Sequence, residues 1–180
     1  GISCWLNGDI AACNLQQLLS QSGCPEVIYH LAGGSAVGPS FASPMEDFIR
    51  TVDSTAQLLD WIRRDCLTAK IVCISSAAVY GAGHQGPIRE DASLSPYSPY
   101  GFHKAMMETL CQSYGANFGV KVSVVRFFSV YGAGLEKQLL WDICCQLSAV
   151  PSTILLSGTG GEIRDWIHIS DVVRLLWQMK

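Results

Sequence analysis

Short apolar runs that end in turn residues alternate along this chain with longer segments of helical periodicity. Residues 27–32 form an apolar run that stops at two glycines, and residues 69–76 and 120–128 are two further apolar runs. Such runs are typical of buried strands. Residues 153–156 predict a fourth, shorter strand. Apolar positions with helical spacing predict helices at residues 44–64, 100–118, 139–147 and 170–179.

The order of these elements predicts the fold class. Strands that alternate with helices form βαβ units, in which a parallel sheet is covered by helices on both faces. The sequence therefore predicts an α/β, Rossmann-type doubly wound parallel sheet. Ligands of such sheets bind beyond the carboxyl ends of the strands. Polar residues gather at these ends, where Ser35, Ser76 and Ser129 each end or follow a predicted strand.

The usual glycine-rich start of a dinucleotide fold is not found. No G-x-G-x-x-G follows an opening strand, and only Cys4 to Leu6 suggests the remnant of one. We therefore expect residues 1–180 to be a partial Rossmann-type NAD(P)-binding and catalytic domain. It would lack its N-terminal glycine-rich βαβ portion and part of its C-terminal substrate domain. Residues 133–180 would begin the substrate-binding portion.

Composition narrows the class of protein. The 180 residues are 49% hydrophobic and carry a net charge of −3, without the basic face that nucleic-acid binding requires. No apolar run reaches the roughly 20 residues that cross a membrane. The eight cysteines form no C-x-x-C pair, which favours free thiols in a reducing cytoplasm over zinc or disulfides. None of the four histidines has the spacing of a metal site, so we expect no metal. His30 and His168 lie in apolar segments, so we expect both to be hydrogen-bonded core residues.

One pair of side chains suggests catalysis. Tyr100 and Lys104 lie four residues apart at the start of a predicted helix, so they share one face. A free phenol has a pKa of about 10. A nearby ammonium favours the phenolate, so we expect Lys104 to lower the pKa of Tyr100 and prepare it for proton transfer. Chance spacing in an amphipathic helix is the alternative. Ser76 either bonds the same reacting oxygen or satisfies the local backbone.

Six segments follow one another in a recognisable order. In this order and spacing, the chain resembles the extended short-chain dehydrogenases/reductases, namely the nucleotide-sugar epimerases and dehydratases, with a subclass similarity to UDP-galactose 4-epimerase. The segments are residues 8–10, 27–33, 75–81, 98–104, 126–132 and 164–172.

The resemblance implies site residues. The catalytic set falls on Ser76, Tyr100 and Lys104. The positions implied to bind NAD, with NADP as an alternative, are Asp9, Ile10, Leu31, Ala32, Gly33, Ser35, Thr51, Tyr100, Lys104 and Phe128. The positions implied to bind substrate are Ser76, Tyr100, Ser129 and Arg164. A guanidinium suits the phosphate oxygens of a sugar nucleotide, although a surface ion pair of Arg164 with Asp165 or Glu162 is the alternative.

Departures from the family pattern select among its activities. The dehydratases carry an Asp-Glu pair after the Ser/Thr, where this chain has Ala77 and Ala78, which move no protons. Thr51 and Ser129 each replace a common asparagine. The resemblance therefore implies a nucleotide-sugar epimerase that uses transient hydride transfer to NAD. The alternatives are a ketoreductase or 4,6-dehydratase of the same family, or a non-catalytic sugar-nucleotide-binding homologue.

The resemblance also implies partners. The expected ligand is a nucleotide sugar, with neither nucleic acid nor membrane. The helices at residues 44–64 and 100–118 carry apolar residues on more than one side, for example Met106, Met107 and Leu110. In the family these helices pair with their copies in a second subunit, so we expect a homodimer through a four-helix bundle. Core packing of both helix faces is the alternative.

Overall fold

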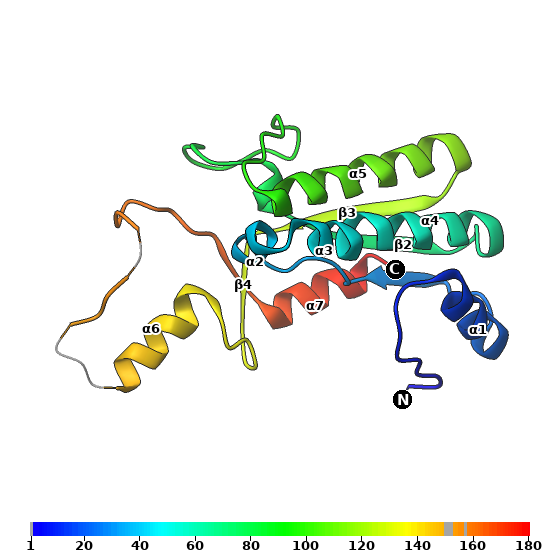
Figure 1. The fold of residues 1–180 in the computed structure, drawn as a ribbon, viewed down its shortest axis with the longest axis horizontal. Coiled ribbons are helices and arrows are strands. Elements are labelled where there is room, and N and C mark those ends of the chain that lie inside the picture. The colour runs from blue at the N-terminus through cyan, green and yellow to red at the C-terminus, as the bar shows by residue number, and fades with distance from the viewer. Residues whose placement is uncertain (1, 150–152, 157) are drawn as a thin grey trace. The chain divides into compact units, whose positions relative to one another are not determined.

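The computed structural model describes residues 2–149, 153–156 and 158–180. The chain divides into two compact units, residues 1–127 with Lys180 and residues 128–179. The first unit, blue to yellow-green in Figure 1, holds the parallel sheet and most of the helices. Each unit is an arrangement of its own and is described separately below.

The first unit is built on a three-stranded parallel sheet. Its strands are β1 (Val27–His30), β2 (Lys70–Ser76) and β3 (Lys121–Phe127), in the order β1-β2-β3. His30 pairs with Cys73, and Ser76 pairs with Phe127. Since the strands are parallel, their carboxyl ends lie at one edge of the sheet. The three long strands predicted from the sequence are confirmed, each one or two residues shorter than expected.

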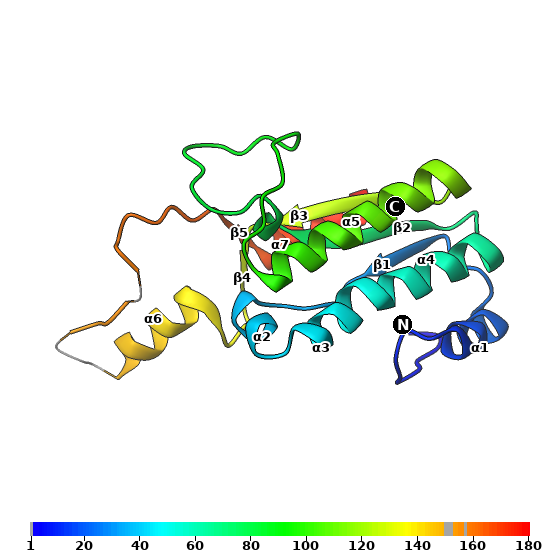
Figure 2. The same ribbon diagram turned by 45° about the horizontal axis from the view of Figure 1, so that its top comes forward.

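Helices precede and follow the strands. They are α1 (Ala12–Ser22), α2 (Val37–Ala42), α3 (Pro44–Phe48), η1 (Ile49–Asp53), α4 (Ser54–Asp65), η2 (Ala77–Val79) and α5 (Pro99–Phe118). The predicted helix at residues 44–64 is present but interrupted by one π-helical turn, and α5 is confirmed within one residue. Neither α1 nor α2 was predicted, because their sequences lack a long apolar period. Figures 1 and 2 show α4 and α5 side by side along the sheet.

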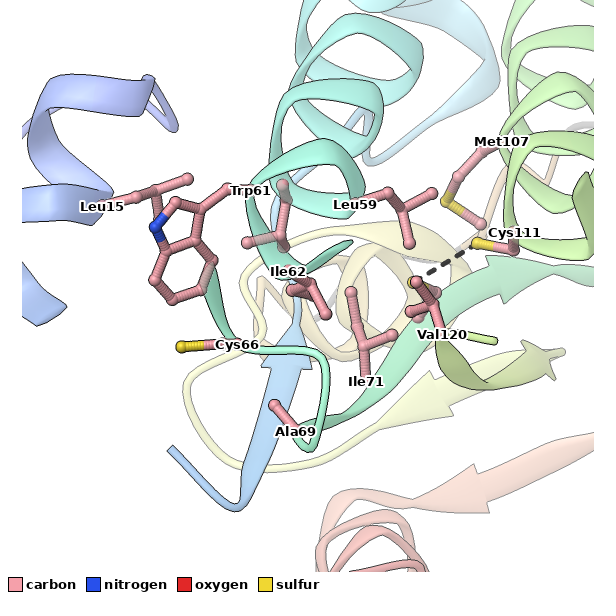
Figure 3. Packing of buried hydrophobic residues seen from close by; sticks show 12 residues of the cluster. Leu15, Leu59, Trp61, Ile62, Cys66, Ala69, Ile71, Met107, Cys111 and Val120 are labelled. Atoms are coloured by element: carbon pink, nitrogen blue, oxygen red, sulfur yellow. Dashed lines mark hydrogen bonds between the residues drawn. The ribbon is translucent and has the colours of Figure 1, made fainter. Parts of the chain in front are cut away.

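The hydrophobic core fills the space between these two helices and the sheet (Figure 3). Leu59 and Ile62 of α4 point at Ile71 of β2, and Met107 of α5 packs from the neighbouring helix. All four side chains are fully buried. Burial of each such side chain stabilises the fold by about 1.5–3 kcal/mol. The core therefore fixes α5 against the sheet and, with it, the residues at the start of α5.

Local sequence determines where α5 begins and ends. The Ser98 hydroxyl accepts a hydrogen bond from the Gly101 N–H at 3.2 Å, and Pro99 takes the first helical position. At the other end Gly119 adopts a left-handed conformation with φ 71° and donates its N–H to the Gly115 carbonyl. The cap places Tyr100 in the first turn of the helix.

The second unit is smaller. It contains a parallel pair of short strands, β4 (Ser129–Tyr131) and β5 (Trp166–His168), with α6 (Gln138–Ser148) and α7 (Ile169–Gln178). The predicted helices at residues 139–147 and 170–179 are confirmed. Residues 153–156 form no strand, so that prediction is wrong. The strand that pairs with β4 in this unit is β5. Residues 4–6 form no strand either.

Three predicted properties of single side chains have clear outcomes. All eight cysteines are free thiols, and Cys73 and Cys111 lie 3.5 Å apart in the core. His30 is a buried, hydrogen-bonded core residue, as predicted. His168 is not a core residue, because it is half-buried and its ring accepts the Ser170 N–H at the start of α7. Among the described residues, no helix is long and apolar enough to cross a bilayer.

Candidate active site

Three side chains predicted as catalytic come together at the carboxyl end of β2. Ser76 is the last residue of that strand, and its side chain lies close enough to the Tyr100 phenol to have a lowering effect on the pKa of that phenol. The Lys104 Nζ lies 5.9 Å from the centre of the Tyr100 ring. Tyr100 is half-buried, whereas Lys104 is buried. The structure therefore gathers a hydroxyl, a phenol and an ammonium in one place.

Neighbouring backbone holds these residues. The Ser76 Oγ accepts the Ala78 N–H at 3.2 Å, so Ser76 satisfies the local backbone as well as contacting Tyr100. A Cβ on Gly101 would lie 2.7 Å from the Ala78 carbonyl oxygen, so only glycine lets α5 approach η2 this closely. The buried Ser40 hydroxyl accepts the Tyr100 N–H at 3.1 Å. These contacts fix the first turn of α5 to the strand end.

Lys104 reaches from α5 to the sheet. Its Nζ donates a hydrogen bond to the Ile74 carbonyl oxygen at 2.8 Å. Burial lowers the pKa of Lys104, while the negative charges of Asp47 and Glu108 oppose that shift. A Cβ on Gly33 would lie 3.2 Å from the same Nζ. The ammonium therefore stands between the end of β2 and the glycine turn after β1.

The prediction that Tyr100 has a lowered pKa is wrong. Burial raises the pKa of the Tyr100 phenol above its ordinary value, the hydrogen bond with Ser76 opposes this, and the charge of Asp47 adds to it. Taking a phenolate out of water costs more than one hydrogen bond returns. Lys104 directs its ammonium to the Ile74 carbonyl, so it offsets little of that cost.

The chain after β1 forms an open strip of backbone. Leu31 is 67% exposed, and Ala32 and Ser35 are exposed as well. The strip is held from beneath, because the Gly34 N–H donates to the Thr51 Oγ1 at 2.8 Å. Thr51 is itself fully buried, so its hydroxyl supports the strip rather than facing the surface. These exposed residues flank Gly33, where a Cβ would lie 3.2 Å from the Lys104 Nζ.

Five further predicted residues lie ahead of α1 or in the second unit. Asp9 is exposed ahead of α1, where its carbonyl oxygen accepts a hydrogen bond from Asn14 Nδ2 at 2.8 Å, and Ile10 packs against the core. Phe128, Ser129 and Arg164 belong to the second unit. Phe128 and Arg164 are exposed there, and the Ser129 N–H donates to the Asp165 carbonyl at 3.1 Å. Roles for these five residues stay predictions.

Sequence reasoning missed two buried polar clusters. Asp47 lies 2.5 Å from the His103 ring nitrogen, next to Lys104. Glu108, one helical turn beyond Lys104, forms an ion pair with Arg126 at 2.6 Å. Each cluster joins residues that are far apart in the sequence. The only signals in the sequence were His103, directly before Lys104, and Glu108, one helical turn after it.

Comparisons with known proteins agree with this arrangement. The NAD dependent epimerase/dehydratase family matches residues 4–180. The UDP-glucose 4-epimerase of Azospirillum brasilense is 31% identical over 93% of this chain and 52% of its own length.

Two solved structures are similar as well. The UDP-glucuronic acid 4-epimerase of Bacillus cereus, solved with UDP-glucuronic acid and NAD, has a TM-score of 0.80 and 32% identity over 93% of this chain and 52% of its own. MoeE5, solved with UDP-glucuronic acid and NAD, has a TM-score of 0.82 and 31% identity over 96% of this chain and 56% of its own.

The chain thus spans about half the length of the relatives that it matches. The match nevertheless extends over nearly all of its residues, and it includes the strand end and helix start that hold Ser76, Tyr100 and Lys104. The α/β fold with its parallel sheet agrees with the same relationship. This chain belongs to the NAD dependent epimerase/dehydratase family.

Proposed function

We propose that the full-length protein is an NAD-dependent nucleotide-sugar epimerase with Tyr100 as its proton-transfer residue. The observation that carries this proposal is the gathering of Ser76, Tyr100 and Lys104 at the carboxyl end of β2, with the Lys104 Nζ 5.9 Å from the centre of the Tyr100 ring. The UDP-sugar 4-epimerases among the similar proteins support the choice of activity, and the Bacillus cereus epimerase and MoeE5, both solved with NAD, support the choice of cofactor.

The residues around the strip after β1 fit a dinucleotide. Leu31, Ala32 and Ser35 are exposed, and the absence of a side chain at Gly33 and Gly34 lets Lys104 and Asp47 come close to this backbone. A Cβ on Gly34 would overlap the Asp47 carboxylate, and Gly33 has φ 140°, a conformation that favours glycine. The exposed residues Leu31, Ala32 and Ser35 are accessible to an extended ligand. When bound, NAD would supply the hydride acceptor and a positive charge.

The residues of this chain handle the proton. Tyr100 takes the proton from a sugar hydroxyl and later returns it, while Ser76 holds the same oxygen by a hydrogen bond. Lys104, fixed by the Ile74 carbonyl, keeps its ammonium beside the ring and Gly33. Because burial raises the pKa of Tyr100, the phenol is protonated at neutral pH and needs added positive charge to act as a base.

The residues after Ser76 favour epimerisation over dehydration. Ala77 and Ala78 form the first two residues of η2, directly after the Ser76 side chain that meets Tyr100. Neither side chain can donate or accept a proton, so elimination of water has no acid or base here. A ketoreductase consumes its reduced cofactor stoichiometrically, whereas an epimerase leaves the cofactor unchanged. Measuring net cofactor oxidation during turnover separates the two activities.

Substitution of Tyr100 tests the proposal. In the full-length protein, Tyr100→Phe removes the proton acceptor and should lower kcat by roughly 10²- to 10⁴-fold. Tyr97→Phe is the matched control, because Tyr97 is exposed in the loop before α5. Epimerisation of a panel of UDP-sugars with NAD is the measurement. Near-normal turnover by Tyr100→Phe would remove Tyr100 from the mechanism and overturn the proposal.

The homodimer is proposed on the apolar surface of α5. Met107 is fully buried in the core, but Met106 and Phe102, four residues apart on the same helix, are 46% and 49% exposed. Ile49 of η1 is exposed as well. A second copy of this surface is the occupant that we propose. Met106→Glu should convert a dimer into a monomer in light scattering of the full-length protein, whereas Lys121→Glu, at an exposed strand end, should not.

A further inference from the structure

A buried acid–imidazole pair lies directly behind the Tyr100 centre. Asp47, on α3, and His103, on α5, approach to 2.5 Å between Oδ2 and Nδ1. Their side chains are only 7% and 12% exposed. An ionised carboxylate can only accept a hydrogen bond, so His103 donates. Such charge-assisted bonds are short and strong, which matches this distance.

Both partners are held in place by the surrounding fold. The Asp47 Oδ1 lies against Gly34, where a Cβ would overlap it, and the Gly34 N–H is bound by the Thr51 hydroxyl. The His103 ring meets the Phe48 ring edge-on, with centroids 5.5 Å apart. The Asp47 carboxylate therefore packs against Gly34, which together with Gly33 we call the glycine strip, and the His103 imidazole reaches it from α5, the helix that carries Tyr100.

We propose that Asp47 and His103 form a charge-tuning pair that acts through Tyr100 and Lys104. In this pair the Asp47 carboxylate supplies negative charge behind the glycine strip, and the hydrogen bond from His103 limits how much of that charge reaches the phenol. The inference rests on the proposed role of Tyr100 in proton transfer. Neither residue touches the reacting atoms, so both are positioning residues.

The charges that surround the pair support this role. Asp47 raises the pKa of the Tyr100 phenol and also that of the Lys104 ammonium. Of the other charged groups on the same segment, Glu46 forms an exposed ion pair with Arg50 at 2.5 Å. Glu46 therefore has an opposite charge of its own. Among the described residues that carry a negative charge, Asp47 is the only one that acts on both Tyr100 and Lys104.

The two halves of the pair should act in opposite directions. In Asp47→Asn the negative charge is lost while the shape is kept, so the Tyr100 phenol should titrate at lower pH than in the wild type. In His103→Leu the donor is lost and the carboxylate stands unpaired, so Tyr100 should titrate at higher pH. His103→Gln keeps an N–H donor and should lie between His103→Leu and the wild type. A purely structural role predicts no such opposition.

The experiment measures Tyr100 directly. Tyrosinate absorbance is followed against pH in the full-length protein, and subtraction of the same titration in a Tyr100→Phe background isolates the signal of this one phenol. Glu46→Gln is the matched control, since it removes an exposed carboxylate from the same helix and should cause no shift. This titration needs no turnover, so it can fail while the Tyr100→Phe activity test succeeds, and the reverse.

The outcomes decide the proposal. Opposite shifts for Asp47→Asn and His103→Leu, followed by the acid limb of the rate profile, support it. Unchanged midpoints, or shifts of one sign in both variants, overturn it. If His103→Leu does not fold, the signs for Asp47→Asn and His103→Gln give the same decision.

Discussion

Two buried polar clusters lie one helical turn apart along α5, and they differ in how their charges are satisfied. At Glu108, every charge meets an opposite partner, because Arg126 donates two hydrogen bonds from Nε and Nη2 and Ser75 adds a third. Arg126 also donates from Nη1 to the Tyr80 hydroxyl and to the Glu90 carbonyl. The pKa of Arg126 is raised by this pairing with Glu108.

The cluster at the start of α5 is less completely paired. The Lys104 ammonium donates to a neutral carbonyl, the pKa of Tyr100 is raised by burial, and Asp47 meets only an imidazole. A fully paired buried ion pair stabilises the structure in one arrangement, because a change of charge on either partner would leave the other charge buried without a partner. Groups held without a full countercharge respond to a neighbouring ligand or proton. The comparison indicates that Glu108 supports the fold, whereas Tyr100 and its neighbours carry the chemistry.

The largest effect is expected when the fully paired cluster at Glu108 is broken. Glu108→Ala leaves the Arg126 guanidinium without its buried partner, and the free energy of unfolding should fall by about 3–5 kcal/mol. Denaturant titration of the full-length protein measures the change. Asp60→Asn, which disrupts a half-exposed pair with Arg63, is the control and should cost at most about 1 kcal/mol. Equal losses in both variants would erase the distinction between the two clusters.

The next effect concerns His30, which lies near Lys104. Its Nε2 is 2.8 Å from the Thr55 hydroxyl, and burial, aided by the Lys104 charge, lowers its pKa to about 4 from 6.5. The unfolded chain binds this proton first, so the stability from neutral His30 is complete above pH 6.5 and is lost as the pH falls toward 4. The loss should be about 3 kcal/mol.

Denaturant midpoints between these two pH values check this expectation for His30. His30→Gln should flatten the pH dependence, whereas His84→Gln, in the exposed loop after η2, should leave it as in the wild type. A wild-type slope in His30→Gln would show that other groups cause the acid sensitivity. In that case His30 of β1 would not belong to the less completely paired cluster around Lys104.

The smallest effect concerns the helix cap that both clusters share. Ser98→Ala removes the side-chain acceptor of the Gly101 N–H and should cost about 1 kcal/mol of stability. Because the cap orders the first turn, Tyr100-dependent turnover should fall while the Glu108 cluster stays intact. Ser93→Ala, at an exposed loop position, serves as the reference. Loss of the Glu108 cluster in Ser98→Ala, seen by hydrogen exchange, would mean that the clusters are not independent.

The sequence by itself determined the parallel strands, the extent of α5 and the shared face of Tyr100 and Lys104. These features depend on local patterns, namely apolar periodicity, a serine–proline start and a spacing of one helical turn. The prediction of a strand at residues 153–156 was wrong because it also used only a local pattern, and a short apolar run does not show whether another strand will pair with it. The partner of β4 was β5, some 35 residues away by sequence numbering.

Only the tertiary structure decided the protonation of the site and the partners of its charges. Spacing suggested that Lys104 makes Tyr100 acidic, but burial raises the pKa of the phenol, and the ammonium turns to the Ile74 carbonyl. Asp47 and His103 are 56 residues apart, and no periodicity links them. Solvent exclusion and long-range contacts set these properties, because both arise only when distant segments pack together.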